Sequence, residues 1–436
     1  MSTNPSRQEP RRRGLKALKH DLVVLREGPF RSLFYARTVS MLGNGIAPIA
    51  LAFAVLGRSH GGAYDLGMVL AARSIAQVVF LLYGGVLSDR LSRYRQMMIS
   101  DLMAFVAQGS IAILFAVHTG SLVPIVALSA VNGAAAALFV PASRAVIPDV
   151  VAPERRQQAT ALLRLTRSMS NIGGAAAGGV LVVAFGSSAA LGIDALSYLG
   201  SAILLLGLRG IAESNHSSSK PSFVRELREG WDEFRARSWV WIVVLQFSII
   251  NLCFTPSITV LGVIIARDRL GGAGAWSLVL SCQAAGLVIG GVVALRLRPR
   301  RPMSTAVRAT LGFLPPFALL GFGAPLWTIA LAMLVNGMCS DVFEVLWETT
   351  LQAHIPPGAL ARVSSYDALG SFVLGPVGLL LVGPVSGAIG TEATLLGAGS
   401  LILVATVLAL CTPSVRRLPP IPDELPTSKE SSCDML

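Results

Sequence analysis

The chain has 436 residues, of which 53% are hydrophobic and only 14% are charged, and its mean hydropathy is +0.64. A soluble domain carries about 25% charged residues, so these charges are too few to cover the surface of a water-soluble protein of this size. The composition excludes a soluble enzyme, an intrinsically disordered protein and a nucleic-acid-binding protein. The net charge of +12 must then be explained by membrane topology, with no nucleic acid as partner.

Apolar segments long enough to cross about 30 Å of hydrocarbon begin after the polar and basic residues 1–30. There are twelve of them, and the sequence therefore predicts an all-α integral membrane protein with twelve transmembrane helices. The predicted spans are 31–57, 64–87, 96–118, 121–147, 158–185, 189–209, 239–266, 273–296, 305–323, 325–354, 359–388 and 391–411.

The longest loop separates six predicted spans from the other six, and the last residues are rich in Pro, Ser and acidic side chains, which is typical of disorder. The predicted parts are a cytosolic basic tail 1–30, a six-helix half 31–209, a cytosolic loop 210–238, a second six-helix half 239–411 and a cytosolic disordered tail 412–436.

The central loop contains an amphipathic pattern. Phe223, Leu227, Trp231 and Phe234 recur at helical spacing, with arginines between them. Such a helix is typical of one that lies on the inner membrane surface. A helix that binds a partner protein is the alternative.

The basic residues are divided unevenly between the two sides of the predicted membrane. With the N-terminus inside, 28 Lys and Arg fall in inner segments and three fall in outer loops. The positive-inside rule therefore places both termini in the cytosol. Only four of the 36 basic residues are Lys, which suggests a GC-rich bacterial genome, so we expect a multi-pass protein of the bacterial cell membrane.

The two halves also repeat each other in sequence. Residues 84–97 align without a gap on residues 290–303, an offset of 206, and Ser40 and Pro48 answer Ser248 and Pro256 at an offset of 208. A near-constant offset in the same order indicates two parallel six-helix repeats, an architecture that places a binding site near the middle of the membrane.

Residues 85–95 read Gly-Val-Leu-Ser-Asp-Arg-Leu-Ser-Arg-Tyr-Arg. This segment resembles the loop between the second and third helices of the major facilitator superfamily, with Ser92 and Tyr94 as departures from the usual motif. The twelve spans and the central loop match that family over the whole chain. The resemblance implies the major facilitator fold and alternating access within one chain, so we expect a monomer.

In that family the loop acts as a conformational latch on the cytosolic side, with its acid near a helix N-terminus or an arginine of a neighbouring span. A purely topogenic basic loop is the alternative. The resemblance implies a latch role for Gly85, Asp89, Arg90, Arg93 and Arg95, with Arg144 as the candidate partner of Asp89.

Further segments are similar to the group that contains macrolide-efflux and enterobactin-export proteins. The stretch 139–148, Phe-Val-Pro-Ala-Ser-Arg-Ala-Val-Ile-Pro, is one of them. Gly174, Gly178 and Gly179 resemble an antiporter signature in which Ala175 replaces the usual Pro. Glycines at this spacing also permit close packing of helices, which is the alternative.

Ionisable side chains inside a bilayer are costly and are candidates for function. Asp341, Glu344 and Glu348 lie three and four residues apart on the tenth span, so they share one helical face. The resemblance implies that this helix lines the transport cavity, where a carboxylate can take a proton from one side and release it to the other. The alternative for Glu348 is a plain interfacial charge. Asp194 is a further candidate for proton coupling, with a structural role as its alternative.

Other polar residues lie within the spans that the resemblance assigns to the cavity or beside them. Arg37 is a candidate for binding an anionic substrate or for opposing the acidic face, with snorkelling to the interface as the alternative. Amides on such helices serve equally well as contacts between helices. The candidate cavity residues are Arg37, Asn44, Arg73, Gln77, Gln246, Asn251 and Asn336.

These observations predict a secondary active transporter that exports a hydrophobic or amphipathic small molecule in exchange for protons. The five Cys and five His show no metal-binding spacing, and there is no ATP-binding loop of the form G-x-x-x-x-G-K-S/T. We expect no enzyme activity, no metal and no cofactor apart from the proton motive force. An importer or uniporter of a metabolite such as a sugar is the alternative within transport, and a transport-dead sensor is the alternative outside it.

Overall fold

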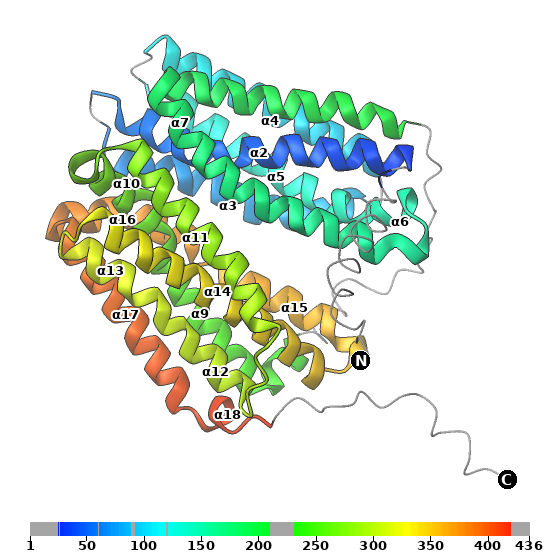
Figure 1. The fold of residues 1–436 in the computed structure, drawn as a ribbon, viewed down its shortest axis with the longest axis vertical. Coiled ribbons are helices and arrows are strands. Elements are labelled where there is room, and N and C mark those ends of the chain that lie inside the picture. Colours follow the sequence, from blue (N-terminus) through cyan, green and yellow to red (C-terminus); the bar gives the residue numbers. More distant parts are fainter. Residues whose placement is uncertain are drawn as a thin grey trace, which may run out of the picture. The chain divides into compact units, whose positions relative to one another are not determined.

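The computed structural model describes residues 25, 27–59, 61–88, 92–118, 121–209 and 231–419, and their side chains except at 82–88, 144, 357, 358 and 361 (Figure 1). Helices fill almost all of this part of the chain, and no strand occurs in it. Helices are the expected result for apolar spans, because only internal hydrogen bonds satisfy the backbone in hydrocarbon.

The first half begins with long helices joined by short connections. They are α2 (Gly28–Leu56), α3 (Ala63–Ser88), α4 (Arg93–Ala116), α5 (Val123–Ala145), α6 (Ile147–Val150) and α7 (Arg156–Leu205), with 3-10 turns at Pro153–Arg155 and Leu206–Leu208.

The second half is more interrupted. Its helices are α9 (Ser238–Pro256), α10 (Gly262–Ile265), α11 (Ala273–Ala294), α12 (Pro302–Ala309), α13 (Leu314–Gly321), α14 (Leu326–His354), α15 (Pro357–Phe372), α16 (Gly375–Ile389), α17 (Thr391–Cys411) and α18 (Pro413–Arg416). Two π-helical turns, Ser257–Leu261 and Ala266–Leu270, flank α10, and a 3-10 turn, Thr310–Phe313, joins α12 to α13.

Eleven helical stretches in the described residues are long and apolar enough to cross a membrane. One of them, Pro153–Leu208, has 56 residues, which would be about 84 Å long as a single helix. Gly186 interrupts it with a φ of 82° and a ψ of 164°, a conformation that glycine adopts readily. The stretch is therefore two spans, and the predicted twelve-span all-helical architecture is confirmed.

The contacts between helices divide the chain into two units. The first unit comprises residues 1–218, 255–284 and 376–394, and the second comprises 219–254, 285–375 and 395–436. These boundaries differ from the predicted halves because parts of α11 and α16, together with the turns around α10, pack with the first six spans.

In the first unit, α2 lies along α7 at a point where both helices carry glycine. A Cβ placed on Gly174 would lie 2.7 Å from the Cα of Gly45 and 2.9 Å from the backbone oxygen of Leu42. Gly178 lies against the backbone of Ile46, and Gly179 against the side chain of Ser277 on α11. The three glycines therefore lie where neighbouring helices approach too closely for a side chain.

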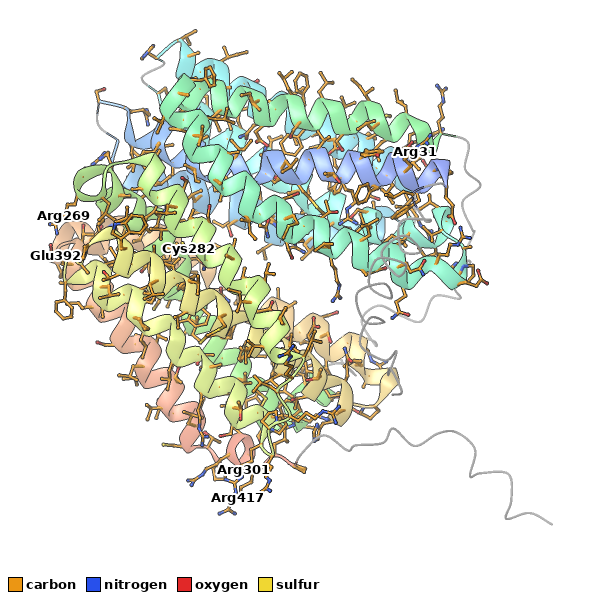
Figure 2. The ribbon with its side chains drawn as sticks, viewed as in Figure 1. Arg31, Arg269, Cys282, Arg301, Glu392 and Arg417 are labelled. Atoms are coloured by element: carbon orange, nitrogen blue, oxygen red, sulfur yellow. The ribbon has the colours of Figure 1, made fainter. Side chains whose placement is uncertain are left out.

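The same unit carries an ion pair between two connections. Arg269, in the π-helical turn after α10, lies 2.6 Å from the carboxylate of Glu392 at the start of α17 (Figure 2). Both side chains are about half exposed, so this pair contributes little to stability by itself.

The core of the second unit is rich in aromatic side chains. Trp239 and Trp347 pack edge to face with 5.7 Å between ring centroids, and Phe234 is buried in the same cluster. Phe234 comes from the end of the central loop, where residues 231–236 form a helix that packs on Tyr366 of α15.

This packing bears on the predicted surface helix. The side chain of Phe234 is buried against other side chains of the protein, whereas Trp231 of the same pattern is 47% exposed, so the surface helix stays a prediction. Just after this short helix, Arg237 donates a hydrogen bond to Glu233 and lowers the pKa of that carboxyl. Residues 210–230, including Phe223 and Leu227, lie outside the described residues.

Replacement of Gly174 tests the close approach of α2 and α7. We expect Gly174→Ala to lower the free energy of unfolding by about 1–3 kcal/mol, because the new methyl group meets a rigid backbone. The measurement is the Tm of the purified protein in detergent.

Gly173→Ala is the matched control, because nothing lies within 4 Å of a Cβ at Gly173. The control should keep or raise the Tm, since Ala is the better helix former by about 0.8–1.0 kcal/mol. Equal Tm values for the two variants would contradict the described contact.

Candidate functional site

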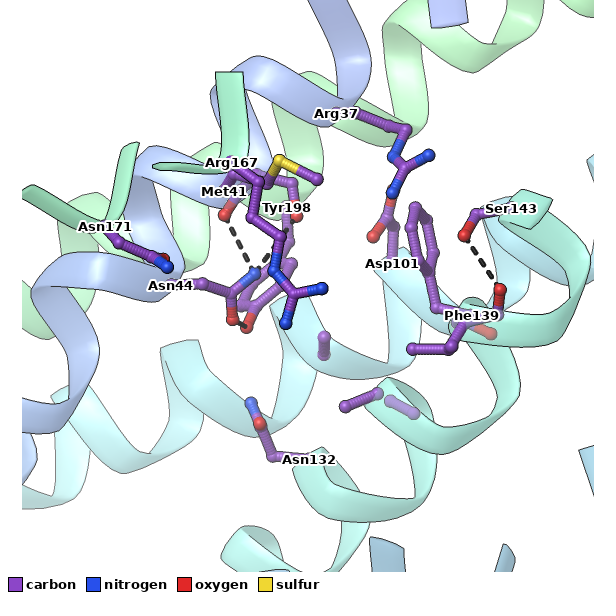
Figure 3. A pocket seen from close by; sticks show the side chains of 16 residues that line it. Arg37, Met41, Asn44, Asp101, Asn132, Phe139, Ser143, Arg167, Asn171 and Tyr198 are labelled. Carbon is purple, nitrogen blue, oxygen red and sulfur yellow. Dashed lines mark hydrogen bonds between the residues drawn. The ribbon is translucent and has the colours of Figure 1, made fainter. Parts of the chain in front are cut away.

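A cavity of about 280 Å³ lies within the first unit, between α2, α4, α5 and α7. Its wall combines charged, amide and apolar side chains, and Figure 3 shows them converging from the four helices. The residues labelled there are Arg37, Met41, Asn44, Asp101, Asn132, Phe139, Ser143, Arg167, Asn171 and Tyr198.

Hydrogen bonds hold part of this wall in place. Ser201 Oγ donates to Asp101 Oδ2 at 2.6 Å, and the Tyr198 hydroxyl donates to Asn44 Oδ1 at 2.7 Å. Asn44 Nδ2 in turn donates to the backbone oxygen of Ser40 at 2.9 Å. The polar side chains on this side are therefore oriented before any ligand arrives.

Asp194 lies on the same face of α7 as Tyr198 and Ser201, but it is fully buried rather than exposed in the cavity. A Cβ at Gly43 would lie 2.5 Å from its Oδ1, so α2 covers the carboxylate. Neither carboxylate oxygen of Asp194 accepts a hydrogen bond from the described part of the chain.

A second cavity, of about 160 Å³, lies within the second unit between α9, α14 and α15. Phe247 and Phe343 stack there with 4.8 Å between centroids. Trp347 Nε1 donates to Asp367 Oδ2 at 3.0 Å, and Ser371 Oγ donates to Asp367 Oδ1 at 3.2 Å. Glu344 completes an aromatic and acidic wall.

The three acids of α14 have different surroundings. Glu344 and Glu348 are exposed, and only Glu344 lines the described cavity of the second unit. Asp341 is half-buried against α11, where a Cβ at Gly290 would lie 3.0 Å from the Cβ of Asp341.

Several of the predicted cavity residues connect helices instead. Gln246 Nε2 donates to Thr310 Oγ1 at 2.9 Å and to Thr406 Oγ1 at 3.1 Å. Asn251 Nδ2 donates to the backbone oxygen of Ser371 at 3.0 Å, and Asn336 is fully buried. The hydrogen bonds of Gln246 and Asn251 match the alternative role as contacts between helices.

Of the candidate cavity residues, only Arg37 and Asn44 line the cavity of the first unit. Arg73 and Gln77 lie outside it: the backbone of Arg73 packs against Gly133 of α5, and Gln77 is exposed.

The predicted latch is described only in part. Asp89 and Arg90 lie outside the described residues, as do the surroundings of Gly85 and the side chain of Arg144. Arg95 is exposed.

Among the predicted latch residues, Arg93 forms a described ion pair, with Asp149. Its Nη1 donates to Asp149 Oδ2 at 2.6 Å and to the backbone oxygen of Ala145 at 3.0 Å. The pair joins the start of α4 to α6, and the side chain of Asp149 is only 2% exposed.

Sequence reasoning did not select Asp101, Asp149, Arg167 or Asp367. Asp101 and Asp367 fall within nine residues of the end of a predicted span, where a charge is expected to lie at the interface. Arg167 lies within the predicted span 158–185. Because a charge in hydrocarbon is costly, its presence in a span was a sequence signal that could have identified it.

The sequence identifies the family of this helical membrane protein. The model of the Major Facilitator Superfamily matches residues 33–373, so the chain belongs to that family. This family indicates a transporter rather than an enzyme.

Two relatives among known proteins are efflux proteins. The multidrug efflux pump Tap of Mycolicibacterium fortuitum is 25% identical over 416 residues, which is 90% of this chain and 98% of the relative. The enterobactin exporter EntS of Shigella boydii is 25% identical over 398 residues, which is 89% of this chain and 94% of the relative.

Solved structures resemble the chain in fold. The nucleoside transporter NupG superimposes with a TM-score of 0.69 at 15% identity, covering 88% of this chain and 98% of that one. A bacterial homologue of the iron transporter ferroportin in an inward-facing state gives a TM-score of 0.69 at 17% identity, covering 88% and 98%.

The pair formed by Arg93 and Asp149 is open to a direct test. We expect Asp149→Asn to lower the free energy of unfolding by about 1–3 kcal/mol, because it leaves a largely buried guanidinium without its carboxylate. Asp149→Asn combined with Arg93→Gln should cost less than the sum of the two single variants. Tm values of the four proteins give the coupling energy.

Glu154→Gln is the control, since Glu154 is an exposed acid a few residues further along the chain. Additive effects of Asp149→Asn and Arg93→Gln would show that the ion pair contributes nothing.

Proposed function

We propose that the chain is a secondary active exporter of a hydrophobic or amphipathic small molecule, such as an antibiotic, a siderophore or another natural product. The relatives that support this proposal are efflux proteins matched over about 90% of the chain. The observation that carries it is the cavity of about 280 Å³ within the first six spans, which has both charged and apolar walls. Such a wall suits a molecule with a polar end and an apolar body.

Protons are the proposed energy source. The sequence has no ATP-binding loop, and α14 carries carboxylates in its middle. Asp341 lies near residue 340, the midpoint of α14, and Glu344 lies one turn further along. Charges at that depth are costly and mark ion and proton pathways, so we assign proton exchange to these two acids.

The test of proton exchange uses proteoliposomes with an imposed pH gradient. Three fluorescent amphipaths of different charge serve as solutes: ethidium, anilinonaphthalene sulfonate and neutral N-phenylnaphthylamine. We expect the wild type to accumulate at least one of them against its gradient. Asp341→Asn combined with Glu344→Gln should retain exchange down a gradient but lose pH-driven accumulation, because an amide mimics the proton-loaded acid.

Asp232→Asn is the control, because Asp232 is exposed and lies outside the spans. Full pH-driven accumulation by the double variant would exclude the acids of α14 as proton carriers and make Asp194 the next candidate. A wild type that moves none of the solutes in either direction would favour the sensor, and accumulation in the inward direction would favour an importer.

We further propose that the protein lies in the bacterial cell membrane with both termini in the cytosol. The uneven distribution of basic residues supports this orientation. Arg301 and Arg417, both assigned to the inner side, lie at the same end of the second unit (Figure 2).

Cysteine labelling tests this orientation in a variant without native cysteines. Ser59→Cys should react with a membrane-impermeant maleimide in intact cells, because Ser59 is an exposed residue of an outer loop. Glu154→Cys, equally exposed, should react only after the cells are opened. Labelling of Glu154→Cys in intact cells would reverse the topology.

A further inference from the structure

Arg167 lies deep in the membrane part of α7. The limb of this helix that precedes Gly186 runs from Arg156 to Phe185, about 45 Å at about 1.5 Å per residue. Arg167 is therefore about 5 Å from the middle of the limb, and Asn171 is at the middle. Both side chains line the cavity of the first unit.

The guanidinium of Arg167 forms no ion pair or hydrogen bond with any of the described residues, and Asn171 also makes no hydrogen bond within them. Arg93, Arg155 and Arg269 differ, because each of them pairs with a carboxylate. A charge at membrane depth without a partner is costly, so a ligand that brings a negative charge would be favoured here.

The other charges of the cavity do not cancel this one. Asp101 is its sole acidic lining residue, and that side chain is 2% exposed and accepts a hydrogen bond from Ser201. Arg37 also lines the cavity, from α2. The lining residues therefore include two arginines and one acid.

The remaining wall is apolar. Met41, Phe139 and Val140 line the cavity beside the charged and amide groups. A guanidinium presents paired donors that match the oxygens of a carboxylate, sulfonate or phosphate.

We propose that this cavity binds the acidic group of an amphipathic organic anion, with Arg167 as the main charge and Asn171 as a donor beside it. The proposal rests on the exporter function and names its substrate class. Arg37 holds the second side of the acidic group, and Met41 and Phe139 contact the apolar body.

Binding to the purified protein in phosphatidylcholine nanodiscs tests the proposal without transport. The probes are anilinonaphthalene sulfonate and N-phenylnaphthylamine, which share an aromatic body and differ in the sulfonate. Titrations are followed by fluorescence after subtraction of empty nanodiscs. We expect Arg167→Gln to weaken binding of the sulfonate about tenfold or more, the usual size for a lost charged hydrogen bond. Binding of the neutral probe should be unchanged.

Two variants serve as controls. Arg164→Gln removes an exposed arginine one turn away on α7 that does not line the cavity, and it should bind both probes like the wild type. Arg167→Lys keeps the charge but lacks the paired donors, so it should bind the sulfonate more tightly than Arg167→Gln and more weakly than the wild type. The unchanged neutral probe shows that the variants are folded.

An anionic lipid headgroup has the same chemistry as the proposed ligand. Titrations in nanodiscs with added phosphatidylglycerol distinguish binding of a lipid headgroup from binding of a free organic anion. If this lipid abolishes the Arg167-dependent sulfonate binding, a headgroup occupies the site and the substrate assignment is overturned.

Equal sulfonate affinity of Arg167→Gln and the wild type, or equal weakening of both probes, also overturns the proposal. Either result leaves the exporter function standing, because that function is tested separately by pH-driven accumulation of any of the three amphipaths.

Discussion

Hydrocarbon offers no hydrogen-bond partner, and this constraint accounts for most of what the described residues do. The backbone is helical throughout the spans, because each peptide group must be satisfied within its own segment. Polar side chains inside the spans find partners on neighbouring helices, as Gln246 does with Thr310 and Asp101 with Ser201. Side chains that lack such a partner are then the informative ones, and Arg167 is among them.

The contact between α2 and α7 shows how the same constraint shapes the cavity. Arg167, Asn171, Gly174 and Gly178 follow one another at steps of four, three and four, so they form one stripe along α7. Where the stripe is glycine, α2 lies in direct contact, with Gly174 against Gly45. Where the stripe changes to Arg167 and Asn171, a cavity opens between the helices. A single helical face thus provides both the close packing and the binding wall.

Much of the fold could be predicted from the sequence, because span length and apolar content report directly on the membrane. The break at Gly186 falls between two predicted spans, 158–185 and 189–209. The division into contact units could not be predicted, since it depends on which helix ends pack together rather than on where the longest loop lies.

The candidate site was harder to predict from the sequence than the fold. An amide in a span has the same pattern whether it faces a cavity, as Asn44 does, or fixes another helix, as Gln246 does. Acids near the end of a span look interfacial, which concealed Asp101 and Asp367. Only the helix neighbours decide these cases, and a single sequence does not contain them.

The hydrogen bonds in the first cavity have a further consequence for binding. Asn44, Tyr198 and Asp101 are already held by their neighbours, so a ligand that contacts them orders few additional side chains. The ordering cost of binding is therefore small on this wall. Arg167 has no such restraint from the described residues and must be ordered by the ligand itself. A charge-assisted hydrogen bond is stronger than a neutral one. The bond between Arg167 and an anionic ligand can therefore offset the free-energy cost of ordering the Arg167 side chain.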